Sequence, residues 1–184
     1  MRTHKIEGII LRRRNFGEAD RILTVLSKEF GKIQVKAPGV RKIPSRRSSH
    51  VELLNFSQLT LYASSKVFMP IVTEAQTLDD FSSIKDNLRK IGYAYYICEL
   101  VNGLCPDNQE NRDVFFHLKA TLSELAKTLN ILTLVKEFEE NLLSKLGFWS
   151  EARLLQTQDS RIIMERLLER KLKTIRVMPL FAEE

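Results

Sequence analysis

Cysteine and histidine are scarce in this sequence, and their scarcity excludes several kinds of site. The 184 residues include two cysteines, Cys98 and Cys105, and three histidines that lie far apart. If the two cysteines share a helix, they lie about 10.5 Å apart along its axis, which is too far for a disulfide. Two cysteines without clustered histidines also make a poor zinc site. We therefore expect no disulfide, no metal and no cofactor.

Long apolar runs are also missing. No stretch approaches the roughly 18 consecutive apolar residues that a membrane-spanning helix needs. The short apolar run in MRTHKIEGIILRRR ends at three arginines, which is not the form of a secretory signal. The expected compartment is the cytoplasm.

The common catalytic motifs are absent. Neither glycine-rich phosphate loop, G-x-G-x-x-G or G-x-x-x-x-G-K-[ST], occurs. The histidines lie in different predicted elements, so no nucleophile–histidine set is indicated. In EFEEN, at 137–141, Glu137 and Glu140 lie three residues apart and could share a metal, but a solvated helix face explains them better. An enzyme therefore has little support.

Acidic residues are scarce in the first 50 residues, which leaves that part strongly positive. It holds 13 lysines and arginines against 4 acidic residues, whereas residues 81–184 hold 15 of each kind. The net charge of +6 therefore belongs to the amino-terminal part. This asymmetry indicates a polyanionic partner, either nucleic acid or an anionic membrane surface.

The first 80 residues alternate like short strands. Five strands are predicted, in IEGIILRRR, DRILTVLSKE, KIQVKAPGV, SQLTLYA and VFMPIVTEA. One face of the fifth strand is predicted to hold Val67, Met69, Ile71, Thr73 and Ala75. Five strands in this length predict a small antiparallel barrel, for which an OB-fold is one candidate.

After residue 80 the apolar period becomes helical. The first helix is predicted to start at a capping box of Ser83 and Asp86 and to end before Pro106. Its predicted apolar stripe is Ile84, Leu88, Ile91, Tyr95, Cys98 and Cys105. Three more helices are predicted, through Phe115–Leu129, from Thr133 as N-cap to Gly147, and from near Ser160. The predicted class is α+β, with a basic barrel domain at 1–80 and a helical domain at 81–184.

The basic side chains of the predicted barrel are the candidate binding site. On one face they would neutralise phosphates and release counterions. Phe16 and Tyr62 are candidate platforms for base stacking, worth about 1–3 kcal/mol per base. For any single cation, an ordinary solvated position is an equally good explanation. The candidate cations are Arg12, Arg13, Arg14, Arg21, Lys32, Lys36, Arg41, Lys42, Arg46 and Arg47.

The last four of these cations lie on a predicted loop, GVRKIPSRRSSH, at 39–50. Its serines and Pro44 favour a segment that stays mobile until DNA orders it, which is a hypothesis.

Three segments of the sequence resemble a known family. EGIILRRRNFGEADRILTVLSKEFGKIQVKAPGVRK looks like the N-terminal domain of RecO, the bacterial recombination mediator. KEFEENLLSKLGF, at 136–148, is similar to the family's basic-x-Phe-Glu-x-x-Leu-Leu-x-x-Leu-Gly-aromatic helix. LLERKLKTIRVM, at 167–178, resembles its closing helix.

The resemblance implies an OB-fold followed by a helical domain. It implies binding of single- and double-stranded DNA, annealing of complementary strands, and work with RecR in loading RecA. It also implies docking on the C-terminal tail of SSB, the single-stranded DNA-binding protein. Lys136 matches a basic position that grips this acidic tail. The DNA contacts that carry over are Lys32, Lys36, Arg41 and Lys42.

Two departures from the family pattern matter. Many members carry a four-cysteine zinc module after the Leu-Gly-aromatic helix, where this chain has WSEARLLQTQDSR. We expect the zinc module to be absent and this segment to be a linker. Pro38 stands where the family often has a cation.

The prediction is a non-enzymatic DNA repair accessory protein, nucleoid-associated and without a membrane partner, that binds and anneals DNA. One alternative is a ribosome-associated RNA-binding OB-fold protein without annealing activity. Another is a metal enzyme that uses Glu137 and Glu140.

Overall fold

The computed structural model describes residues 2–64, 68–156 and 158–174. The chain forms two compact units, one of residues 1–80 and 106–115 and the other of residues 81–105 and 116–184. Val67 of the predicted fifth strand, and the end of the segment that resembles the closing helix, lie outside the described residues.

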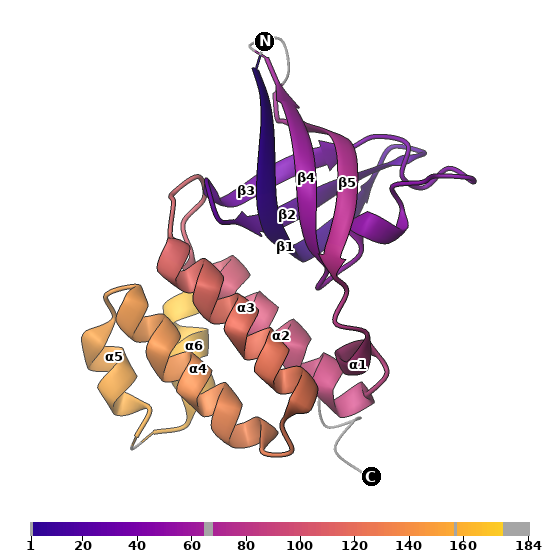
Figure 1. The fold of residues 1–184 in the computed structure, drawn as a ribbon. Coiled ribbons are helices and arrows are strands. Elements are labelled where there is room, and N and C mark those ends of the chain that lie inside the picture. The colour runs from indigo at the N-terminus through magenta and orange to yellow at the C-terminus, as the bar shows by residue number, and fades with distance from the viewer. Residues whose placement is uncertain (1, 65–67, 157, 175–184) are drawn as a thin grey trace. The chain divides into compact units, whose positions relative to one another are not determined.

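Five strands close into a barrel in the order β1-β2-β3-β5-β4 (Figure 1). They are β1 (Arg2–Phe16), β2 (Asp20–Ser27), β3 (Gly31–Ala37), β4 (Phe56–Ala63) and β5 (Ile71–Asp79). The long β1 pairs with β4 along its first half and with β2 along its second. One parallel bridge, between Lys36 and Ile71, joins β3 to β5. This is an OB-fold, so the predicted α+β class, a barrel followed by helices, is confirmed.

Alternate aliphatic side chains fill the barrel. Each fully buried valine, leucine or isoleucine side chain stabilises the fold by about 1.5–3 kcal/mol. The core holds Ile6, Ile10, Leu23, Val25, Ile33, Val35, Ala37, Val40, Val51, Leu59, Leu61 and Val72. Val40 and Val51 come from the loop between β3 and β4 (residues 38–55), so both ends of this loop are anchored in the core.

The predicted grouping of residues on one face of β5 is wrong. The register shifts between Thr60 and Leu61, which face Glu74 and Val72, and this leaves Thr73 as an extra residue. Val72 therefore belongs to the core, with Ala75 packed against it, while Thr73 is exposed. Because side chains alternate with a period of two, one extra residue moves those before it to the other face.

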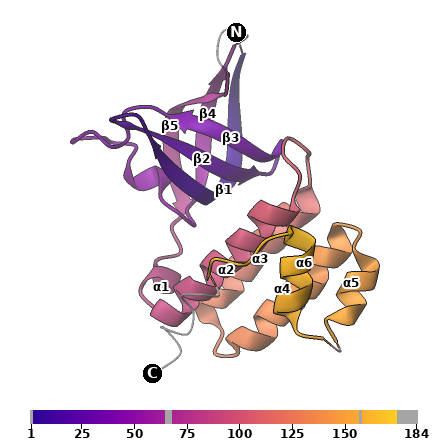
Figure 2. The ribbon, with the colours of Figure 1, turned by 180° about the vertical axis from the view of Figure 1, so that it is seen from behind.

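The second unit is helical (Figure 2). Its elements are α1 (Ser82–Lys85), α2 (Leu88–Leu104), α3 (Arg112–Lys127), α4 (Ile131–Lys145), α5 (Trp149–Leu154) and α6 (Ser160–Leu168). Its buried side chains include Ile97, Leu100, Leu118, Leu122, Phe138, Leu142 and Met164. No helix among the described residues is long and apolar enough to cross a membrane.

The predicted first helix is wrong in its start and in its stripe. The helix is interrupted between α1 and α2, where the Asn87 side chain accepts a hydrogen bond from the Lys90 N–H and caps α2. Leu88 and Tyr95 are exposed, and the buried face runs instead through residues such as Ile97. The break resets the helical phase, so a single stripe cannot run through both helices.

Two smaller predictions about the helices also need correction. The third predicted helix begins at Ile131 rather than after Thr133. The segment predicted as a linker contains α5. Cys98 and Cys105 are both buried, and burial raises the pKa of the Cys98 thiol to about 12.

Candidate nucleic-acid interface

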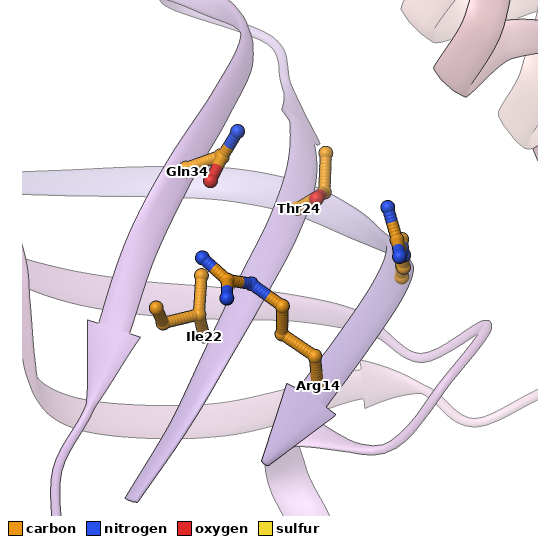
Figure 3. Close-up of a pocket in the computed structure, with 5 residues that line it drawn as sticks. Arg14, Ile22, Thr24 and Gln34 are labelled. Carbon is orange, nitrogen blue, oxygen red and sulfur yellow. The ribbon is translucent and has the colours of Figure 1, made fainter. Parts of the chain in front are cut away.

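The outward side of β1, β2 and β3 carries a shallow cavity of about 290 Å³. Strand register places Arg12 opposite Thr24, Arg14 opposite Ile22, and Thr24 opposite Gln34. These five side chains line the cavity, and Figure 3 shows Arg14 reaching across β2. We call this side of the three strands the outer face. The side chains of Arg12 and Arg14 are exposed and make no hydrogen bond or ion pair within the described residues, so both charges are available to a ligand.

Phe16 and Lys36 extend the outer face. Phe16 is 45% exposed and follows Arg14 at the spacing that keeps it on the same side of β1. The Lys36 ammonium lies 5.1 Å from the Phe16 ring centroid and 2.9 Å from a carboxylate oxygen of Asp20. The hydrogen bond from Lys36, with one from the Gly39 N–H, lowers the pKa of Asp20. Lys36 is therefore partly neutralised, and an arriving phosphate would compete with Asp20 for it.

Arg13 and Arg21 do not belong to the outer face. They stand opposite the core residues Leu23 and Ala37, and both bond to Glu52. The Arg21 Nη1 atom lies 2.8 Å from one Glu52 oxygen, and Arg13 bonds the other. Two predicted DNA contacts therefore share one internal carboxylate.

Arg21 is the more buried of these two arginines. Its Nε atom is buried and has no hydrogen-bond partner among the residues that the structure describes. Burial, with repulsion from Arg13 and Arg41, lowers the pKa of Arg21. Its guanidinium is therefore placed to serve the fold rather than to meet an external ligand.

Lys32 is also engaged inside the barrel unit. It is 8% exposed, and its ammonium lies 3.1 Å from an Asp107 oxygen. Its carbonyl accepts a hydrogen bond of 2.8 Å from the Asn108 N–H. A DNA phosphate would have to displace Asp107 to reach this lysine.

The loop between β3 and β4 is fixed at its base by Arg47. The Arg47 guanidinium donates to the carbonyls of Val72 and Pro38, at 2.6 and 2.8 Å. The Arg41 N–H bonds the Ala19 carbonyl, and its guanidinium donates to Gly17 at 3.1 Å. Arg47 is thus a structural clamp, and Arg41 is partly engaged.

The loop tip (residues 42–46) differs from its base. Lys42 and Arg46 are exposed, and no side-chain hydrogen bond or ion pair of either occurs in the described part of the chain. The positive charge of Lys42 helps lower the pKa of Asp20. The tip therefore carries two available cations.

Tyr62 lies apart from the cavity. The register joins Tyr62 to Ile71 and Ile71 to Lys36, so Tyr62 stands two strands from Lys36. At about 4.8 Å per strand this is roughly 10 Å around the barrel. The structure does not bring Tyr62 to the candidate arginines of the outer face.

In the helical unit, Lys136 is exposed on α4 one turn after Leu132, which is 61% exposed. Glu137 is exposed and Glu140 is half-buried, whereas Glu139 is buried and accepts a hydrogen bond from the Tyr96 hydroxyl. Burial raises the pKa of Glu139, against the effect of its hydrogen bonds. No group of three or more histidine, cysteine or acidic residues that would hold a metal occurs among the described residues.

Sequence reasoning did not identify the acidic residues that pair with the candidate cations. Glu52 and Asp107 carry no local signal, because each lies far along the chain from its cation. The i, i+2 spacing of Arg12 and Arg14 would have indicated that these two side chains share one face of the strand. Arg13, which lies between them, would then be expected on the opposite face.

Comparison with known proteins gives the family context. Residues 1–81 match the family model "Recombination protein O N terminal", and residues 85–150 match "Recombination protein O C terminal". A protein named DNA repair protein RecO from Roseiflexus sp. (strain RS-1) is 37% identical over 147 residues, 80% of this chain and 51% of that protein. One of the same name from Dehalococcoides mccartyi (strain CBDB1) is 37% identical over 149 residues, 81% of this chain and 58% of that protein. The chain thus spans little more than half the length of these relatives.

Proposed function

The chain belongs to the RecO family of DNA repair proteins, and we propose that its barrel, residues 1–80, binds single- and double-stranded DNA. The observation that carries the proposal is the pair Arg12 and Arg14, which line a cavity and have no acidic partner among the described residues. Phosphate contacts from such cations release counterions and need no particular base sequence. The exposed Phe16 ring beside them offers a stacking surface.

Annealing follows from the same charges. The outer face and the loop tip are two groups of available cations on one barrel. Phosphates of two strands bound to these groups repel each other less, and base pairing then selects the complementary strand. This role needs no catalytic residue, and we propose that the chain is not an enzyme. Its ligand would be chromosomal DNA, which places it at the nucleoid in the cytoplasm.

The protein partners are proposed from the family resemblance. We propose that the chain works with RecR in loading RecA onto SSB-coated DNA, and that α4 binds the SSB tail. Lys136 beside the exposed Leu132 suits an acidic peptide that ends in apolar residues.

The test of the proposed function measures two quantities. The first is annealing of complementary oligonucleotides coated with SSB, which should be faster than with SSB alone. The second is the slope of log affinity against log salt for a single strand. Arg12→Ala/Arg14→Ala should reduce this slope by about 1.4, because each lost phosphate contact removes about 0.7.

The matched control removes the same charge from the helical unit. Arg89→Ala/Arg153→Ala changes two exposed arginines there and should leave the slope unchanged. No annealing above the SSB control, or tighter binding to duplex RNA without annealing, would overturn the proposal.

A further inference from the structure

Ile43 occupies an unusual position at the loop tip. Its side chain is 98% exposed, and the neighbouring Pro44 is exposed as well. Figures 1 and 2 show the chain between β3 and β4 extending away from the barrel. Single exposed apolar residues are common on protein surfaces. Whether the exposure of Ile43 indicates a function therefore depends on the residues around it.

Those neighbours are cations on both sides. Arg41 and Lys42 precede Ile43, and Arg46 follows it on the other arm of the loop. No acidic residue occurs between Glu29 and Glu52 in the sequence. The loop tip therefore places one apolar side chain between cations on the two sides of the loop. This arrangement is complementary to a DNA groove, which has a row of phosphates along each edge.

The base of the loop holds this tip outward. Arg47 bonds carbonyls of β5 and of the residue after β3, and Val40 and Val51 are fully buried. A tip held by an anchored base loses little conformational entropy when it binds, so more of the contact energy appears as affinity.

We propose that Ile43 is a wedge that enters a base step of duplex DNA from the minor groove. This groove is about 6 Å wide, so cations on the two arms would meet phosphates of opposite strands while the side chain between them reaches the bases. Isoleucine and proline are among the residues that proteins insert in this way, and they partly unstack the step.

Insertion of Ile43 gives the site a preference for certain base steps, which phosphate contacts alone cannot give. Pyrimidine–purine steps such as TA unstack most easily, so they should be favoured. The inference rests on the proposed DNA binding by the barrel, and it adds duplex base steps as a specific ligand.

The test uses the full chain and a duplex oligonucleotide with 2-aminopurine at one TA step. The fluorescence of this base rises when it unstacks. The variant is Ile43→Ser, and the control is Ile162→Ser, which changes a 61% exposed isoleucine of α6. Because the Ile43 side chain is 98% exposed, Ile43→Ser should keep the wild-type unfolding midpoint.

The wild-type chain and the control should raise the fluorescence of the duplex at saturation. Ile43→Ser should lose most of the rise and bind the duplex roughly tenfold more weakly, which corresponds to about 1.4 kcal/mol. Its salt slope should equal that of the wild type, because no phosphate contact is lost.

Three results would overturn the wedge and leave DNA binding intact. They are salt-dependent duplex binding without a fluorescence rise, an equal rise with Ile43→Ser, and a change confined to single strands, which would indicate stacking on unpaired bases. Failure to bind any DNA is a separate result, because it overturns the proposed function itself.

Discussion

The ammonium of Lys32 lies 3.1 Å from a carboxylate oxygen of Asp107, which ties the start of β3 to the segment between α2 and α3. The same segment packs its Gln109 carbonyl against Gly31, and the Phe115 ring lies 6.1 Å from that of Phe56. Residues 106–115 therefore complete the barrel unit, and Lys32 serves this junction.

Gly31→Ala should destabilise the chain by at least about 2 kcal/mol. Gly31 has a φ of +66°, and an added Cβ would collide with the Gln109 backbone. Gly17→Ala is the matched control, because Gly17 has a φ of +57° with open space around it, and it should cost only about 1–2 kcal/mol. Urea unfolding measures both. Equal losses would show that the junction does not press on Gly31.

Glu52→Gln should increase the salt dependence of DNA binding while it weakens the fold. Arg13 and Arg21 would lose their shared counterion, so the more exposed Arg13 could contact a phosphate and add about 0.7 to the single-strand slope. Losing charge-assisted hydrogen bonds should cost about 1–3 kcal/mol of stability. Titrations at several salt concentrations, with urea unfolding, test both effects. A lower slope would mean that Glu52 presents the arginines to DNA.

Arg47→Lys should lower stability by about 1–2 kcal/mol although the charge is kept. One ammonium cannot reproduce the fork that reaches both the Val72 and Pro38 carbonyls. Arg46→Lys, in the exposed neighbour, should change nothing measurable. Thermal unfolding compares the two variants. If the midpoint of Arg47→Lys matched that of Arg46→Lys, the clamp would contribute nothing.

Stability should fall in acid partly through Glu99. Burial alone would raise its pKa, but hydrogen bonds from Arg170, Lys173 and Thr174 hold it at about 2, against 4.5 ordinarily. The folded pKa is depressed, so the contribution is complete above about pH 4.5 and is lost as the pH falls towards 2. By about 1.36 kcal/mol per pK unit, it is at most about 3 kcal/mol.

Glu99→Gln tests this contribution. The variant should be less stable than the wild type at pH 7, and the difference should shrink below pH 4.5. Glu137→Gln, at an exposed position of α4, is the control and should follow the wild-type curve. Urea unfolding at several pH values gives the comparison, and a difference independent of pH would rule out titration of Glu99.

The sequence by itself determined the class of the fold and the location of the positive charge. Alternation and turn residues lie within consecutive stretches, so the strands and the change to helices near residue 80 are visible locally. The β5 face and the first helical stripe were mispredicted, because an extra residue at Thr73 and a break before Asn87 depend on partners elsewhere.

Only the tertiary structure decided which cations remain available. The sequence alone does not distinguish three consecutive arginines, Arg12, Arg13 and Arg14. In the structure, Arg13 pairs with Glu52, which lies 39 residues along the chain, while its two neighbours line the outer face. The electrostatic attraction of a pair depends on its distance in space, and neither that distance nor the burial of Lys32 can be seen in a linear pattern. Folding therefore divided one basic segment into structural pairs and available charges.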